Sequence, residues 1–235
     1  MLRPILTNKE LIQLMELIKD SKSVFICGHR GPDGDAMGAA LGWREYLLNL
    51  GKDVFVAMPN PCPDFLRWMP CAQQVKFYSE STAEVSAAIK KADLIFLLDM
   101  NEAGRTQDMA AELIASKAKK AIIDHHLNPS CEGYDCVVSR PKLSSTSELV
   151  LRIIHQLGGY DRLTRSAAAC IYTGMMTEIR SFIDTPHFCS FEKIHQKGLQ
   201  GYAALYSQTF PRRVVKRPHS RPSFNASRSF RRNSL

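Results

Sequence analysis

The stretch Lys120-Ala-Ile-Ile-Asp-His-His-Leu-Asn-Pro129 joins a short apolar run to three consecutive polar side chains. Residues 121–123 have the pattern of a buried strand, and Asp124, His125 and His126 follow at its C-terminal end. In an open α/β sheet, ligands bind in the crevice at this end of the strands. Two imidazoles and a carboxylate are costly to bury without partners, and a metal ion or a phosphate would supply them. Taken alone, the triplet is weak evidence, because a pair of histidines at a strand end is more often an ordinary surface position.

The same pattern recurs after two other apolar runs. Val24-Phe-Ile-Cys27 and Leu94-Ile-Phe-Leu-Leu98 are continuous apolar segments, which is typical of parallel strands that are covered on both faces. The polar residues that follow them are His29, Asp33, Asp35 and Asp99. Each has a simpler explanation alone, as a turn residue or a cap. Because the carboxyl ends of parallel strands share one edge of a sheet, we expect these groups to converge, with Gly34 allowing a tight turn between the two carboxylates.

Strand patterns alternate with helical patterns along residues 8–176. We expect helices at 8–20, 36–49, 82–91, 107–118, 145–157 and 162–176, and strands at 24–27, 53–57, 94–98, 121–123 and, at an edge, 136–138, with a small further strand at 75–78. This order predicts a doubly wound α/β fold with a mainly parallel sheet of about five strands and helices on both faces.

Composition divides the chain into three parts. Of the 31 Lys and Arg residues, eight lie in 211–235, which has no Asp or Glu, so residues 1–210 carry 23 basic and 23 acidic groups. We therefore expect a catalytic domain at 1–182, a poorly specified segment at 183–210 and a basic, disordered tail at 211–235. The net charge of +8 belongs to the tail and does not identify a partner of the domain.

Several function classes are not expected. No run of about 18 apolar residues is present, so we expect no membrane span. No signal peptide is visible, and seven scattered cysteines indicate reduced thiols in the cytoplasm. A nucleic-acid tether that binds through the basic tail stays as a weaker alternative to an enzyme.

The clustered carboxylates point to metal chemistry. Three or four carboxylates at close range cannot all stay ionised without cations. Mixed imidazole and carboxylate ligands favour Mn²⁺, with Co²⁺, Zn²⁺ or Mg²⁺ less favoured. A two-metal centre with ions about 3.5–4 Å apart activates water and stabilises an in-line phosphoryl displacement. The expected activity is hydrolysis of a phosphate ester. Arg30 and Arg105 are expected to be surface charges, although Arg105 is near enough to Asp99 in sequence to reach a substrate phosphate.

Four segments resemble the successive motifs of the DHH phosphoesterases. They are Gly28-His-Arg-Gly-Pro-Asp-Gly-Asp-Ala-Met-Gly38, Leu98-Asp-Met-Asn-Glu-Ala-Gly-Arg105, Ile123-Asp-His-His126 and Ser144-Ser-Thr-Ser-Glu148. The resemblance covers residues 5 to about 182 and is strongest to the nano-RNases, which are bifunctional oligoribonucleases and 3′-phosphoadenosine 5′-phosphate phosphatases. The family also includes enzymes that act on cyclic dinucleotides and on single-stranded DNA.

The resemblance implies a role for each candidate residue. His29, Asp33 and Asp99 would hold one Mn²⁺, and Asp35, Asp99 and His125 would hold a second, with Asp99 bridging. Asp124 would orient a ligand, and His126 would face the substrate phosphate. Ser145 and Thr146 would support the site. The implied partner is a short RNA or nucleotide, and a homodimer is one assembly that the sequence allows.

Two departures from the family pattern bear on activity. The family carries an aspartate in a segment where this chain has Tyr172-Thr-Gly-Met-Met-Thr-Glu-Ile-Arg-Ser-Phe182, so Glu178 stands in its place beside Arg180, and Asp184 is a weaker substitute. The family's C-terminal substrate-binding domain has no counterpart after about residue 183, which suggests a shifted reading frame or a degraded gene end. A weakly active or inactive remnant that binds metal or nucleotide is therefore the alternative to an active phosphoesterase.

Overall fold

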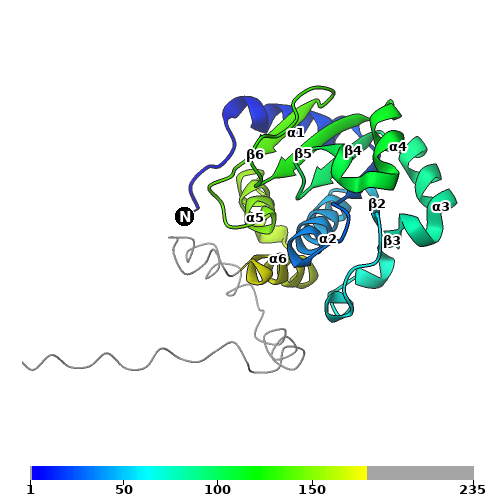
Figure 1. The fold of residues 1–235 in the computed structure, drawn as a ribbon. Coiled ribbons are helices and arrows are strands. Elements are labelled where there is room, and N and C mark those ends of the chain that lie inside the picture. Colours follow the sequence, from blue (N-terminus) through cyan, green and yellow to red (C-terminus); the bar gives the residue numbers. More distant parts are fainter. Residues whose placement is uncertain (1, 179–235) are drawn as a thin grey trace, which may run out of the picture.

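The computed structural model describes residues 2–178, in which six parallel strands form one sheet (Figure 1). The strands are β1 (Ser23–Cys27), β2 (Asp53–Met58), β3 (Lys76–Phe77), β4 (Leu94–Leu98), β5 (Lys119–Asp124) and β6 (Cys136–Ser139), in the order β3-β2-β1-β4-β5-β6. The sheet contains the five expected main strands and, as the two-residue edge strand β3, the small further strand expected at 75–78. The predictions for 183–210 and 211–235 concern residues outside the described part.

Helices cover both faces of the sheet. They are α1 (Asn8–Asp20), α2 (Gly34–Asn49), α3 (Tyr78–Lys91), α4 (Ala110–Ala115), α5 (Thr146–Gln156) and α6 (Arg165–Thr177), with short 3₁₀ helices η1 (Asp64–Leu66), η2 (Ala72–Gln74), η3 (Ala103–Met109) and η4 (Tyr160–Arg162). Helices α1, α2, α5 and α6 share one apolar core with the sheet, and α3 and α4 share the other. The predicted doubly wound α/β fold is confirmed.

One helix differs clearly from the sequence-based expectation. A single helix was expected at 107–118, but the chain forms η3 and then the six-residue α4. Gln107, inside η3, has φ 52° and ψ −98°, which no helix accommodates, so the helical path is interrupted there and α4 begins only at Ala110.

The strand order places a crevice between β1 and β4. The chain moves outward from β1 to β2 and β3, and it then returns to β4 on the other side of β1. Adjacent connections therefore leave the carboxyl ends of β1 and β4 in opposite directions, and ligands bind at such a switch point. Within residues 2–178, no helix combines the length and the apolar character needed to cross a bilayer.

Helices α2 and α6 approach each other through glycines. A Cβ on Gly38 would lie 2.6 Å from the carbonyl oxygen of Cys170, and one on Gly34 would lie 2.3 Å from the Thr177 side chain. Gly34 is the first residue of α2, and Asp33 is the cap that precedes it. The expectation that Gly34 provides a tight turn is therefore wrong, because its missing side chain makes room for α6.

Candidate metal centre

Asp99 lies at the middle of the site, directly after β4. Its side chain is buried, and its backbone is in the left-handed region at φ 59°. Its N–H donates to the carbonyl of Ile123 over 3.1 Å, and the Thr146 hydroxyl donates to its Oδ1 over 2.8 Å. A non-glycine residue held at positive φ costs about 1–3 kcal/mol and persists only where the surroundings enforce it. These two contacts fix the carboxylate at the crevice.

His29 faces two carboxylates from the end of β1. Its Nε2 lies 3.5 Å from Oδ2 of Asp99 and 3.8 Å from Oδ1 of Asp33. Its Nδ1 lies 2.9 Å from the carbonyl oxygen of Arg30, which can only accept, so Nδ1 donates to that oxygen and Nε2 is the ring nitrogen that faces the acids. A ring oriented in this way is typical of histidines that bind metals.

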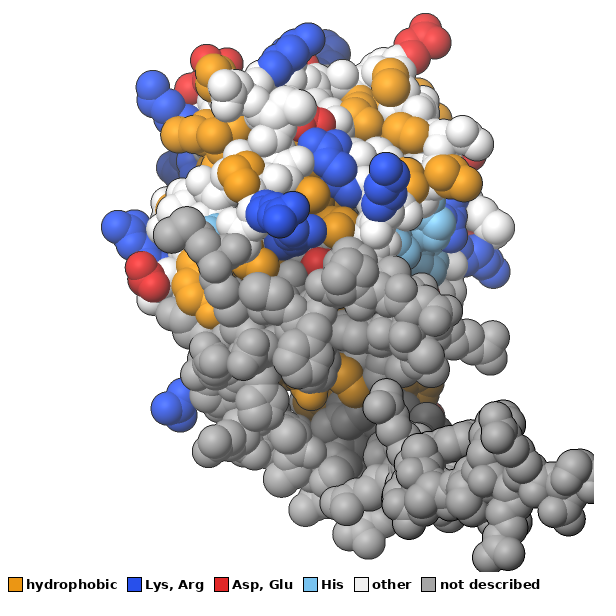
Figure 2. All heavy atoms as spheres, turned by 90° about the vertical axis from the view of Figure 1, so that its left-hand side faces the viewer, with side chains coloured by type: hydrophobic (Ala, Val, Ile, Leu, Met, Phe, Trp, Pro, Cys, Tyr) orange, Lys and Arg blue, Asp and Glu red, His pale blue; other side chains and the backbone are white. Residues whose placement is uncertain are grey.

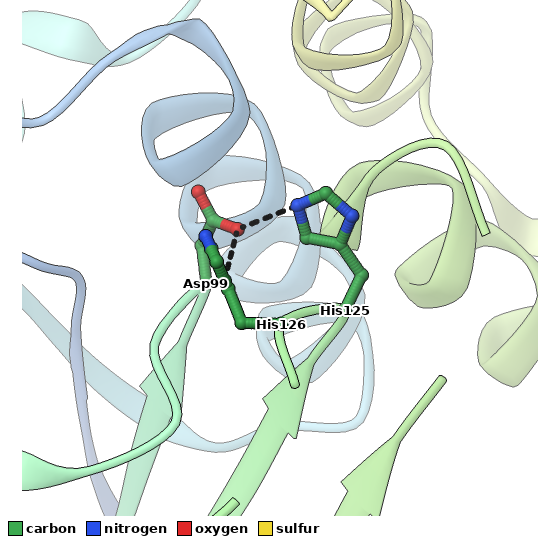
Figure 3. A group of neighbouring side chains, drawn as sticks. All are labelled: Asp99, His125 and His126. Carbon is green, nitrogen blue, oxygen red and sulfur yellow. Dashed lines mark ion pairs between the residues drawn. The ribbon is translucent and has the colours of Figure 1, made fainter. Parts of the chain in front are cut away.

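His125 faces the same centre from β5, and its ring lies beside Asp99 (Figure 3). Its Nε2 lies 3.6 Å from Oδ1 of Asp99 and 3.7 Å from Oδ2 of Asp35. Asp35 is buried, and its two oxygens accept the backbone N–H groups of Thr146 and Ser147 over 2.7 and 2.8 Å. The first turn of α5 therefore anchors this carboxylate in the manner of an anion at a helix N-terminus.

His126 is held by Asp124 and points differently from His125. Its Nδ1 lies 2.7 Å from Oδ1 of Asp124, and since a carboxylate accepts, Nδ1 donates. The 3.8 Å separation between this nitrogen and Asp99 therefore does not make His126 a ligand through Nδ1. The side chain is 37% exposed, and histidine side chains reach the surface of the described part in Figure 2. Its other nitrogen is available to a bound molecule.

The buried carboxylates carry opposite pKa shifts. Burial and the charge of Asp99 raise the pKa of Asp35 well above its usual range. Burial also acts to raise the pKa of Asp99, but hydrogen bonding to His29 and the charges of the histidines outweigh it and lower the pKa. Two such groups cannot both be ionised at low cost without a cation between them. Their chemistry fits a divalent metal.

Two groups of ligand atoms, each within 4.8 Å of one another, meet at Asp99. One is His29, Asp33 and Asp99, and the other is Asp99, His125 and His126. The structure thus brings together the residues that followed three separate strands in the sequence. Asp35 belongs to neither group of ligand atoms, but its carboxylate lies beside the His125 ring.

The remaining predicted residues lie at the margin of the centre. Glu178 follows α6 and is half-buried, and burial with the charges of Asp33 and Asp99 raises its pKa, so it is within electrostatic range of the cluster. The Arg105 charge is among the influences that lower the pKa of His126, although the contact with Asp124 outweighs it. Arg180 and Asp184 lie outside the described part.

The amide groups of Thr146 and Ser147 are contacts of the cluster that the sequence did not reveal. Side-chain patterns do not record backbone donors. The signal that was available is the cap at Ser145, whose hydroxyl accepts the N–H of Glu148 over 3.0 Å and marks a helix N-terminus that can hold an anion.

Comparison with known proteins gives consistent relatives. The bifunctional oligoribonuclease and PAP phosphatase NrnA of Thermus thermophilus is 31% identical over 68% of this chain and 44% of its own length. The cyclic-di-AMP phosphodiesterase GdpP of Geobacillus thermodenitrificans is 27% identical over 72% of this chain and 26% of its own length. The chain therefore spans less than half of these two relatives.

The fold has a close counterpart among solved structures. The crystal structure of an exopolyphosphatase-related protein from Bacteroides fragilis matches with a TM-score of 0.84 and 32% identity, over 89% of this chain and 62% of that one. Residues 23–175, which contain all six strands and the cluster around Asp99, match the DHH family, N-terminal domain. The chain belongs to the DHH family.

Proposed function

We propose that this protein is a metal-dependent phosphoesterase that hydrolyses short oligoribonucleotides or 3′-phosphoadenosine 5′-phosphate. The observation that carries the proposal is the position of Asp99 at the switch point of the sheet, where His29 faces its Oδ2 and His125 faces its Oδ1. A buried carboxylate between two imidazoles suits a pair of divalent ions better than a single one.

The proposed metal ligands are the side chains whose imidazole nitrogens and carboxylate oxygens face one another. His29, Asp33 and Asp99 would hold one ion, and Asp35, Asp99 and His125 would hold the other, with Glu178 as a further ligand. Manganese fits this mixture of imidazole and carboxylate best, with cobalt or magnesium as substitutes. Such a pair, when bound, lowers the pKa of water and stabilises negative charge on phosphoryl oxygens.

The protein's own groups would orient the substrate. Asp124 keeps the proton of His126 on Nδ1, so the Nε2 lone pair accepts a hydrogen bond from a hydroxyl or a protonated phosphate oxygen. Arg105 would bind a phosphate oxygen through its guanidinium. Asp35 and Asp99 stay in place because Thr146 and Ser147 donate to them.

The substrate class rests on the relatives. NrnA is named for oligoribonuclease and PAP phosphatase activity, which supports short RNA and the bisphosphate nucleotide. GdpP is named as a cyclic-di-AMP phosphodiesterase, and its match over 72% of this chain makes a cyclic dinucleotide the second candidate. A cytoplasmic location, a homodimer and a catalytic unit at residues 1–182 belong to the same proposal.

The test is release of mononucleotide from a 5′-phosphorylated diribonucleotide in the presence of Mn²⁺. 3′-Phosphoadenosine 5′-phosphate and cyclic-di-AMP are assayed in parallel to rank the substrates. We expect turnover that stops in Asp99→Asn and continues in the control Asp64→Asn, whose carboxylate is 88% exposed and lies outside the cluster. Full activity of Asp99→Asn, or no turnover by folded and monodisperse wild type, would contradict the proposal.

A further inference from the structure

A basic hollow adjoins the metal centre. It is open to solvent, has a volume of about 430 Å³ and is lined by Arg30, Gly31, Asn60, Arg105 and Gln107. Among these described residues, two carry a positive charge and none carries a negative one. We call this depression the arginine hollow.

The loops that form the arginine hollow follow three different strands and are tied together. The N–H of Arg30, after β1, donates to the carbonyl of Arg105, after β4, over 2.9 Å. The N–H of Gly31 donates to Oδ1 of Asn60, after β2, over 2.7 Å. The hollow therefore exists before any ligand binds, and a ligand would not have to order these loops.

The arginine hollow borders the groups assigned to the metals. Arg30 directly follows His29, and its carbonyl oxygen is the partner of the His29 ring. Arg105 acts electrostatically on His126. A molecule held at the metal centre would thus have its next few atoms within reach of the two guanidinium groups.

The charge of Arg30 is only weakly compensated. Its Nη1 lies 3.3 Å from Oδ2 of Asp108, and the two side chains are 49% and 65% exposed. Exposed ion pairs of this kind contribute about 0–1 kcal/mol, so a phosphate can replace the carboxylate at little cost. Arginine is suited to the exchange because its planar fork binds two phosphate oxygens at once.

We propose that the arginine hollow binds a second phosphate group of the substrate, one that is not cleaved. The enzyme then prefers molecules with two phosphate groups, such as a 5′-phosphorylated dinucleotide or a nucleoside bisphosphate, over those with one. The inference deepens the proposed function and rests on it for the identity of the substrate. The binding itself needs no metal, because the hollow contains none of the assigned ligands.

The test measures equilibrium binding in EDTA of a diribonucleotide with and without a 5′-phosphate. We expect wild type to bind the phosphorylated form more tightly, and Arg30→Gln and Arg105→Gln each to reduce this preference about tenfold, the loss typical of one charged hydrogen bond. Arg67→Gln is the matched control. Its guanidinium also pairs with an exposed aspartate, Asp64, over 3.1 Å, but it lies outside the hollow.

The outcomes separate the two proposals. No preference for the 5′-phosphate in wild type, or an unchanged preference in both hollow variants, overturns the role of the arginine hollow whether or not the protein hydrolyses RNA. An arginine-dependent preference without Mn²⁺-dependent turnover supports the hollow and rejects the enzyme. With active wild type, kcat/KM for the phosphorylated dinucleotide should fall in Arg30→Gln more than kcat/KM for the unphosphorylated one.

Discussion

At the scale of single residues, Asp99 combines a buried carboxylate at the middle of the candidate site with an unfavourable backbone. Its φ of 59° is rare for residues with a β-carbon, and a carboxylate in this conformation is tolerated better than an alkyl side chain. The Thr146 hydroxyl and the Ile123 carbonyl hold it there. The stability of variants at this position therefore reports on the backbone separately from the chemistry.

We predict that Asp99→Gly is more stable than Asp99→Ala by about 1 kcal/mol, because only glycine adopts positive φ without a steric cost. Both changes remove the carboxylate and should abolish activity, so the difference isolates the backbone. Urea unfolding followed by circular dichroism gives the two free energies. Equal stability of the variants would show that the position carries no strain.

The sequence revealed the charged residues of the centre but not all of their partners. His29, Asp99 and Asp124 were predictable because each follows an apolar run that has to be a strand. The anchoring of Asp35 was not, because its partners are backbone amides at positions 146 and 147. The arginine hollow was missed as well, because Asn60 and Gln107 come from separate loops and have no pattern in common with Arg30.

At the scale of elements, the contact between α2 and α6 determines how the site is closed on one side. Gly38 and Gly174 let the two helix backbones approach, and an added Cβ at Gly38 would lie 2.8 Å from Gly174 Cα. Because backbone atoms cannot move aside as the end of a flexible side chain can, the whole of α6 would have to shift. Helix α6 leads into Glu178, so its position matters for the centre.

We predict that Gly38→Ala destabilises the fold by about 1–3 kcal/mol, the usual cost of overpacking a tight core. Gly104→Ala is the control, because its added Cβ would meet nothing closer than 3.5 Å, at the carboxylate of Glu102. Thermal unfolding of the two variants and wild type measures the effect. A Gly38→Ala protein as stable as the control would mean that α6 is not packed as described.

The elements themselves were predictable where periodicity was strong. The five residues of β4 are all buried, as a continuous apolar run in a doubly covered sheet requires. Helix α1 begins at Asn8 as expected, and Thr7 caps it with Glu10 completing a capping box. The prediction of one continuous helix over 107–118 was wrong, because helical propensity is a weak guide where one residue, Gln107, adopts positive φ.

At the scale of the whole molecule, the first described residues are tied to the distant helix α5 and to the loop after β6. The Gln156 side chain accepts the N–H groups of Ile5 and Leu6 over 2.8 and 2.9 Å. Arg140 donates to the carbonyl of Ile5 and pairs with Glu10 over 2.6 Å. These contacts fasten the N-terminal segment and the start of α1 to α5 and to the loop after β6.

The pair between Glu10 and Arg140 makes stability depend on pH. Burial acts to raise the pKa of Glu10, but hydrogen bonds from Arg140 and Thr7 outweigh it and lower the pKa below its ordinary 4.5. Because the folded state favours the charged form, the stabilisation is complete well above pH 4.5 and is lost as the pH falls through the lower folded value.

We predict that Glu10→Gln costs about 0–1 kcal/mol at pH 7, the range for partly exposed pairs, and that the difference from wild type shrinks in acid. Urea midpoints measured at pH 7 and at about pH 3, below the ordinary range for a glutamate, provide the comparison. A difference that stays constant between the two pH values would show that the carboxylate charge contributes nothing.

The glycine contact between α2 and α6 also has a consequence for the growing chain. A ribosome delivers α2 together with His29, Asp33 and Asp35 long before it delivers the surface of α6 on which Gly38 rests. A nascent chain halted after β6 would have all six strands, yet the apolar side of α2 would be uncovered and Asp35 would lack its amide partners on α5. The candidate metal centre is thus completed by α5 and α6, which follow all six described strands in the chain, and a chain interrupted before them exposes an apolar surface for chaperones to bind.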